Sequence, residues 1–189
     1  MAINLVKGEK INLSKQNPGL QKLKIGLSWD IKAGLSADLD ASVLLLNEDG
    51  KMLRADSIVF YNQTTSFDNA VTHSGDSRSG DSDGDDEVIS VDLTKSQANQ
   101  ILAVITSYAD ANQDAVIFGR IKNATVRLYN GETNEVLYTF DLSEDMSNAT
   151  SMEMVKLYKH NGEWRFNAIG ERVGTSKNGL EDVLNKYSN

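Results

Sequence analysis

The strongest chemical signal in the chain is an acidic run at residues 76–87. Six of these twelve residues are Asp or Glu, and Arg78 is the only basic side chain among them. Two carboxylates about 4 Å apart repel each other by roughly 4 kcal/mol at an effective dielectric constant near 20. A compact fold of this run is therefore costly unless a cation lies among the oxygen atoms.

Calcium is the cation that suits this composition. It takes about six to eight hard oxygen ligands from Asp, Glu, Asn and backbone carbonyls, and it tolerates irregular geometry. Zinc, copper and nickel prefer His or Cys, but the chain has no Cys, and His73 is the only His near the run. Magnesium stays open, although it prefers to keep several waters. The sequence thus predicts a calcium site.

An EF-hand can be tested by position. Asp81, Asp83 and Asp85 match the first three ligand positions of the EF-hand loop, but Asp86 stands where that loop requires glycine. The flanking segments also have strand patterns rather than helical ones. We therefore expect a site among loops at the end of a β-sandwich.

Further oxygen ligands lie outside the run. Asp38 and Asp40 lead into a strand, and residues i and i+2 of an extended chain share a face. Asn62 and Asp68 open the long polar segment 62–87 and could join them.

Two other interpretations of the acidic residues stay open. An acidic run with Asp-Gly turns can be a solvated loop without a metal. Paired carboxylates can also act as acid and base, but they then need an apolar pocket that separates their pKa values. The sequence indicates no such pocket, and no Gly-x-Ser-x-Gly motif is present.

The surrounding pattern is that of β-strands. Apolar residues alternate with polar ones at 22–29 and 88–93, and further strands are expected at 43–46, 57–61, 101–107, 124–129, 135–142, 152–159 and 163–169. Asn130-Gly131 and Asn161-Gly162 predict hairpin tips with positive φ. Residues 94–100 could form helical turns, and 180–184 predict a short C-terminal helix. We expect an all-β fold, a two-sheet β-sandwich that forms a single domain over residues 1–189.

Composition narrows the class of partner. The net charge of the 189 residues is −8; residues 38–87, with 12 acidic and 3 basic side chains, have a net charge of −9, and the rest of the chain has +1. Such a surface is unsuited to nucleic acid. The absence of Cys fits a reducing compartment, and we see neither a signal peptide nor an apolar run of about 18 residues. We therefore expect a cytoplasmic protein with no integral membrane segment.

Ordered motifs over most of the chain add a resemblance. The main ones are GLSWD at 26–30, DLDAS at 38–42, VFYN at 59–62, VTHSGD at 71–76 and GDDE at 84–87. Together they resemble the TerD family of tellurium-resistance and general stress proteins. One departure is Asn69, which replaces the glycine that usually follows the position of Asp68.

The resemblance implies a β-sandwich whose loops bind two calcium ions. Carried over by position, the ligands are Asp38, Asp40, Asn62, Asp68, Asp76, Asp85, Asp86 and Glu87, with Asp81, Asp83 and Asp110 as weaker candidates. It also implies a non-enzymatic binding or scaffolding role in resistance to tellurite, phage and chemical stress, with protein partners in a membrane-associated complex. A calcium-dependent lipid-binding module and a metal-dependent hydrolase are the alternatives.

Thermal unfolding in excess calcium and in chelator tests the predicted site. A ligand at 100 times its dissociation constant stabilises the folded state by roughly 2.7 kcal/mol. For a domain of this size we expect a rise in Tm on the order of 5–10 °C. Substituting Asp85 and Asp86 by Asn should remove most of that shift. An unchanged Tm at millimolar calcium would exclude the site.

Overall fold

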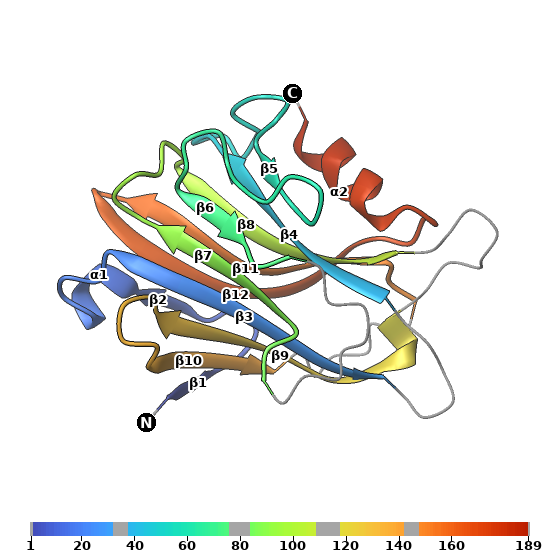
Figure 1. Cartoon of the computed structure of the whole chain (residues 1–189), viewed down its shortest axis with the longest axis horizontal. Coiled ribbons are helices and arrows are strands. Elements are labelled where there is room, and N and C mark those ends of the chain that lie inside the picture. The colour runs from blue at the N-terminus through green and yellow to red at the C-terminus, as the bar shows by residue number, and fades with distance from the viewer. Residues whose placement is uncertain (1, 32–37, 76–83, 109–117, 142–147, 189) are drawn as a thin grey trace.

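The computed structural model describes residues 2–31, 38–75, 84–108, 118–141 and 148–188. Over these ranges two six-stranded sheets pack face to face, and a helix at the C-terminal end lies on the outside of one sheet (Figure 1). The predicted two-sheet β-sandwich and the short C-terminal helix are both confirmed.

The first sheet is antiparallel except for its N-terminal edge strand. Its strands, in spatial order, are β1 (Ile3–Leu5), β10 (Val136–Asp141), β9 (Ile121–Asn130), β3 (Lys22–Ile31), β7 (Glu87–Asp92) and β6 (Val71–His73). The strand β1 runs parallel to β10. Alternation in β3 sends Leu23, Ile25, Leu27 and Trp29 into the core, where each is at most 2% exposed.

The second sheet is antiparallel throughout. Its strands are β2 (Lys10–Asn12), β12 (Glu163–Gly174), β11 (Ser151–His160), β8 (Gln100–Tyr108), β4 (Asp38–Leu46) and β5 (Ile58–Val59). Asn161 and Gly162 join β11 to β12 with φ values of 53° and 76°. The predicted hairpin tip there is confirmed, because both residues take the positive φ of a type I′ turn. A one-turn helix, α1 (Leu13–Gln16), follows β2, and a short 3₁₀ turn, η1 (Phe118–Arg120), precedes β9.

The continuous apolar run in β4 reflects burial on both faces of the strand. Val43 and Leu45 belong to the core between the sheets, whereas Leu44 and Leu46 belong to a second cluster beneath the C-terminal helix α2 (Gly179–Tyr187). A strand covered on both sides has no polar face, so its sequence does not alternate.

Two local predictions were wrong, the second only in part. Residues 94–100 form no helix, because the Asp92 carboxylate accepts hydrogen bonds from the N–H (3.0 Å) and the hydroxyl (2.6 Å) of Thr94, which fixes a turn. The hairpin predicted at Asn130-Gly131 is present, since β9 pairs antiparallel with β10, but its positive φ lies at Asn134 (60°) rather than at Asn130-Gly131. Gly131 is needed there for a close approach, since a Cβ would lie 2.8 Å from the backbone carbon of Lys22.

A buried carboxylate holds α2 against the second sheet. Glu153 in β11 is 5% exposed, and its Oε1 accepts hydrogen bonds from the ammonium of Lys186 and the hydroxyl of Tyr187. Burial, together with the hydrogen bond to Glu153 and its charge, raises the pKa of Tyr187. Neither described helix has the length and apolar content that a membrane-spanning segment needs.

Tyr187→Phe should therefore loosen α2. The variant keeps the ring and removes one donor to a buried charged group, so we expect a loss of about 1–2 kcal/mol in the free energy of unfolding, measured by urea denaturation. Tyr61→Phe is the matched control, because Tyr61 is 44% exposed. An equal loss in both variants would contradict a specific contact between Tyr187 and Glu153.

Candidate functional site

The starts of β4 and β7, beside which Asp40, Asp86 and Glu87 stand in the chain, meet at one end of the sandwich. Asp38 at the start of β4 pairs with Tyr108 at the end of β8, and Glu87 at the start of β7 pairs with Leu27 of β3. The start of β4 and the far end of β3 lie together at the lower right of the molecule in Figure 1.

Glu87 crosses from one sheet to the other. Its side chain is fully buried, and its Oε2 accepts a hydrogen bond of 2.5 Å from the backbone N–H of Ala41 in β4. In the described residues β5 pairs with β4 only at Val43 and Leu44, so no strand there meets the outer edge of Ala41. The carboxylate therefore accepts a hydrogen bond from a backbone N–H that has no acceptor among the described residues of its own sheet.

His73 completes this contact from β6. Its Nε2 lies 3.1 Å from the carbonyl oxygen of Ala41 and 3.4 Å from Oε2 of Glu87. The N–H of Gly75 donates to Nδ1 at 3.0 Å, which assigns the proton of the neutral ring to Nε2. Both ring nitrogens are engaged, so the imidazole offers no lone pair to a metal in this arrangement.

The surroundings of His73 act on its pKa in opposite directions. Burial lowers the pKa, but the hydrogen bond and charge of Glu87, the carbonyl of Ala41 and the charge of Asp40 raise it, and the net direction is upward. Protonation would strengthen the attraction to Glu87, but it would remove the acceptor of the Gly75 N–H. The charge of Glu87 thus favours the protonated ring, whereas the Gly75 N–H favours the neutral ring.

The second oxygen of Glu87 is the atom of the site that could still accept a ligand. Oε1 is buried and has no hydrogen-bond partner among the described residues. A buried charged oxygen without a partner is costly, and an ion is one of its ordinary explanations. A hard carboxylate oxygen in this position fits calcium better than a metal that prefers nitrogen or sulfur.

Two other predicted ligands lie next to this contact. Asp40 is 8% exposed and precedes Ala41 in β4, so alternation places it on the opposite face of the sheet from Ala41. Asp86 is half-buried, and its Oδ2 accepts a hydrogen bond of 2.9 Å from the backbone N–H of Trp29. Asp86 also donates its own N–H to Leu27 (2.7 Å), which anchors the start of β7 to β3.

Asp85 points away from Glu87, over the outer face of the first sheet. Its Oδ1 accepts from Arg127 Nη1 (2.7 Å) and its Oδ2 from the hydroxyl of Tyr129 (2.5 Å). Burial raises the pKa of Tyr129 to about 12, and the hydrogen bond and charge of Asp85 add to the rise. Gly26 lies beneath, where a Cβ would meet Asp85 Oδ2 at 1.9 Å. Both oxygens of Asp85 thus have partners inside the protein.

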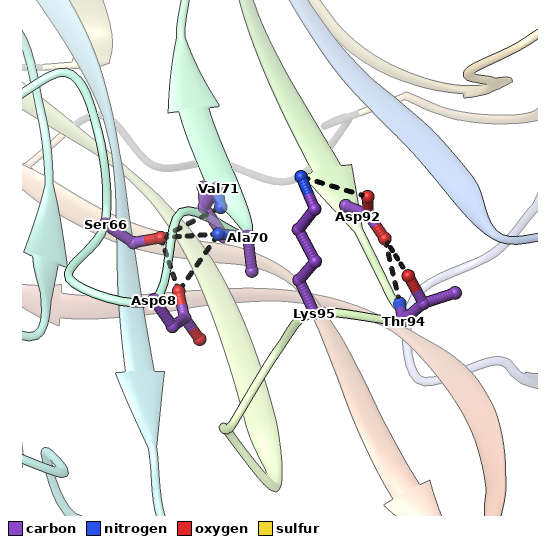
Figure 2. A network of polar contacts seen from close by, with 7 residues as sticks. All are labelled: Ser66, Asp68, Ala70, Val71, Asp92, Thr94 and Lys95. Atoms are coloured by element: carbon purple, nitrogen blue, oxygen red, sulfur yellow. Dashed lines mark hydrogen bonds and ion pairs between the residues drawn. The ribbon is translucent and has the colours of Figure 1, made fainter.

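Asp68 organises a turn before β6 (Figure 2). Its Oδ1 accepts from the Ser66 hydroxyl (2.6 Å) and the Ala70 N–H (3.1 Å), and its Oδ2 accepts from the N–H of Gln97 (2.9 Å). Asn69 adopts the positive φ (55°) that a glycine would supply. The structure brings Asp68 to the turn between β7 and β8 rather than to Glu87.

The remaining predicted ligands are placed as follows. Asn62 is exposed. Only the backbone of Asp38 is described, and Asp76, Asp81, Asp83 and Asp110 lie outside the described residues. In the part of the chain that the structure describes, no three His, Asp or Glu side chains form a group that could hold a metal ion. The complete ligand set therefore stays a prediction.

Comparison with known proteins shows to which family the chain belongs. The family model of the TerD domain matches residues 1–187. The chain belongs to the TerD family. Among its relatives is the general stress protein 16U of Bacillus subtilis, 46% identical over 99% of this chain and 97% of that protein. The tellurium resistance protein TerD of Serratia marcescens is 39% identical, with the same coverage of both chains.

Solved structures support the fold of this TerD-family chain. A homologue of a telluride resistance protein from Streptomyces coelicolor superposes with a TM-score of 0.64, at 21% identity, over 80% of this chain and 89% of that one. At that identity the likeness concerns the fold alone.

Sequence reasoning missed three residues of this TerD-family site: His73, Arg127 and Tyr129. His73 stands in the VTHSGD motif and was considered only as a soft-metal ligand. Arg127 and Tyr129 share the outward face of β9, and a cation and a phenol two residues apart on one strand are the signal that could have marked a carboxylate partner.

Gly26→Ala should displace Asp85 from both of its partners. The nearest atoms belong to a carboxylate held by Arg127 and Tyr129, so we expect a loss of about 1–3 kcal/mol in the free energy of unfolding. Gly84→Ala is the matched control, because a Cβ there meets nothing within 4 Å. Urea denaturation measures both, and equal stability of the two variants would contradict a fixed position of Asp85.

Proposed function

We propose that this chain is a calcium-binding stress-response protein that acts as a binding or scaffolding module. The observation that carries the proposal is the buried Glu87, whose Oε1 has no partner among the described residues. The relatives named as general stress and tellurium resistance proteins support a role in resistance to tellurite and other chemical stress.

Glu87 supplies the first oxygen of the proposed site. Asp40, next to Ala41 in β4, and Asp86, directly before β7, are the nearest predicted ligands along the chain, and Asp38 and Asp76 are the next candidates by position in the sequence. Calcium would provide the positive charge that this group of carboxylates requires. Two ions would reduce the net charge of residues 38–87 from −9 to about −5.

A cation on Glu87 would act on both sheets. Because the same carboxylate accepts from Ala41 in β4 and begins β7, the position of its second oxygen depends on the distance between the sheets. Binding to the folded state alone raises its stability. Calcium would therefore tighten this end of the sandwich and present a less negative surface to a protein partner.

Glu87→Gln tests the proposal directly. The amide keeps an oxygen for the Ala41 N–H but removes the charge that a calcium ligand needs. We expect calcium to raise the Tm of the unsubstituted protein by several degrees and to leave that of Glu87→Gln nearly unchanged. Isothermal calorimetry with calcium should lose the corresponding heat.

Glu153→Gln is the matched control, because it neutralises a carboxylate that is also buried but lies beneath α2. The calcium shift is compared within each variant, so a lower starting Tm does not affect the result. A shift that persists in Glu87→Gln would place the ion elsewhere. A shift absent from the unsubstituted protein would reject calcium binding.

A further inference from the structure

A basic groove lies on the outer face of the second sheet, on strands other than those of the proposed calcium site. Its volume is about 220 Å³, and its lining includes Lys10 of β2, Lys156 and Tyr158 of β11, Asn167 of β12 and Gln100 of β8. The neighbours Leu157, Phe166 and Ala168 face the core, so alternation directs the groove residues outward.

The strand register places two lysines on either side of one amide. Lys156 pairs with Asn167 across β11 and β12, and Asn167 pairs with Lys10 across β12 and β2. Neighbouring strands lie about 4.8 Å apart, so the two ammonium groups can reach one small ligand above Asn167.

These two cations have no acidic partner in the described part of the chain. Neither Lys10 nor Lys156 forms an ion pair there, whereas Lys159 donates to the Ser96 carbonyl (3.1 Å) and lies over the Trp164 ring (4.9 Å). The lining also includes the exposed Glu48, whose backbone carbonyl accepts from Gln100. Two lysines without an acidic partner among the described residues thus line one groove in a chain of net charge −8.

Asn167, between the two lysines, carries a buried polar atom without a partner in the described part of the chain. Oδ1 of Asn167 is buried and has no hydrogen bond among the described residues. The same is true of Nε of Arg165, a residue that stands opposite Tyr158 in the strand register of β12 and β11. Buried polar groups in proteins are almost always satisfied, so the unpaired acceptor of Asn167 in the lining of the groove indicates a missing ligand.

We propose that this groove binds a small phosphate monoester. A phosphate monoester is close to a dianion at neutral pH, which matches two flanking lysines, and Lys is a common point-charge partner of phosphate. A hydroxyl of the organic part would donate to Oδ1 of Asn167. The volume lies below the usual range of about 300–1,000 Å³ for drug-sized ligands, which favours a ligand with few carbon atoms.

Glycerol 3-phosphate is the probe, with inorganic phosphate and glycerol as separate arms. The full chain is freed of calcium on a chelating resin, because soluble polycarboxylate chelators are themselves anions. We expect a saturable rise in Tm and a calorimetric signal with glycerol 3-phosphate, a smaller effect with phosphate, and none with glycerol. Vesicles of phosphatidylglycerol test whether a lipid headgroup is the source instead.

Lys156→Gln should weaken binding about tenfold, the effect of losing one charge-assisted hydrogen bond. Arg172→Gln is the matched control, since Arg172 is an exposed cation of β12, five positions from Asn167, and lies outside the groove. Equal affinity of Lys156→Gln and the unsubstituted protein would overturn the proposal.

Asn167→Asp keeps the test valid if other variants fold poorly. A carboxylate between Lys10 and Lys156 should leave the ligand-free Tm equal or higher and abolish the stabilisation by glycerol 3-phosphate. Retained stabilisation, no saturable effect of any soluble phosphate, or binding confined to the vesicles would each reject a site for a small phosphate monoester.

Discussion

The contact between Glu87 and the backbone of Ala41 is the constraint on which this end of the molecule depends. The strand β4 has no outer neighbour before Val43 among the described residues, and a buried backbone N–H without a partner is strongly disfavoured. A side chain from the opposite sheet supplies the acceptor, and His73 approaches the matching carbonyl. The two sheets are thereby joined by polar contacts as well as by apolar packing. The same requirement buries a carboxylate and leaves its second oxygen available to a cation.

Burial and pairing separate acidic residues that look equivalent in the sequence. Asp85 and Glu87 are two positions apart, yet Asp85 is neutralised by Arg127 on the outer face and Glu87 lies inside the sandwich. Glu153 is also buried, but Lys186 and Tyr187 satisfy it, so it serves only to hold α2. The difference between a structural carboxylate and a candidate ligand is therefore the presence of internal donors, not the residue type. Local charge density alone overstates the number of available ligands.

Much of the fold could be predicted because its signals are local. Alternation in β3 and β7 and the Asn161-Gly162 turn depend on neighbouring residues only. The prediction for 94–100 failed for a local reason, because the Asp92 carboxylate binds Thr94 and fixes a turn. At Asn130-Gly131 the hairpin is present but its positive φ lies at Asn134, and the distant backbone at Lys22 comes too close to Gly131 for any side chain. The continuous run in β4 was recognised as a strand, but its double burial became clear only with α2 in place.

The sequence by itself determined the fold class, the family and the accumulation of carboxylates in residues 38–87, since composition, periodicity and ordered motifs are properties of the chain alone. Only the tertiary structure decided which carboxylates are paired or buried, and by which residues. It turned Asp68 into a turn residue, paired Asp85 with Arg127, and buried Glu87 against Ala41. The physical reason is that hydrogen-bond partners and desolvation come from residues distant in the chain, and no local pattern specifies where those residues meet.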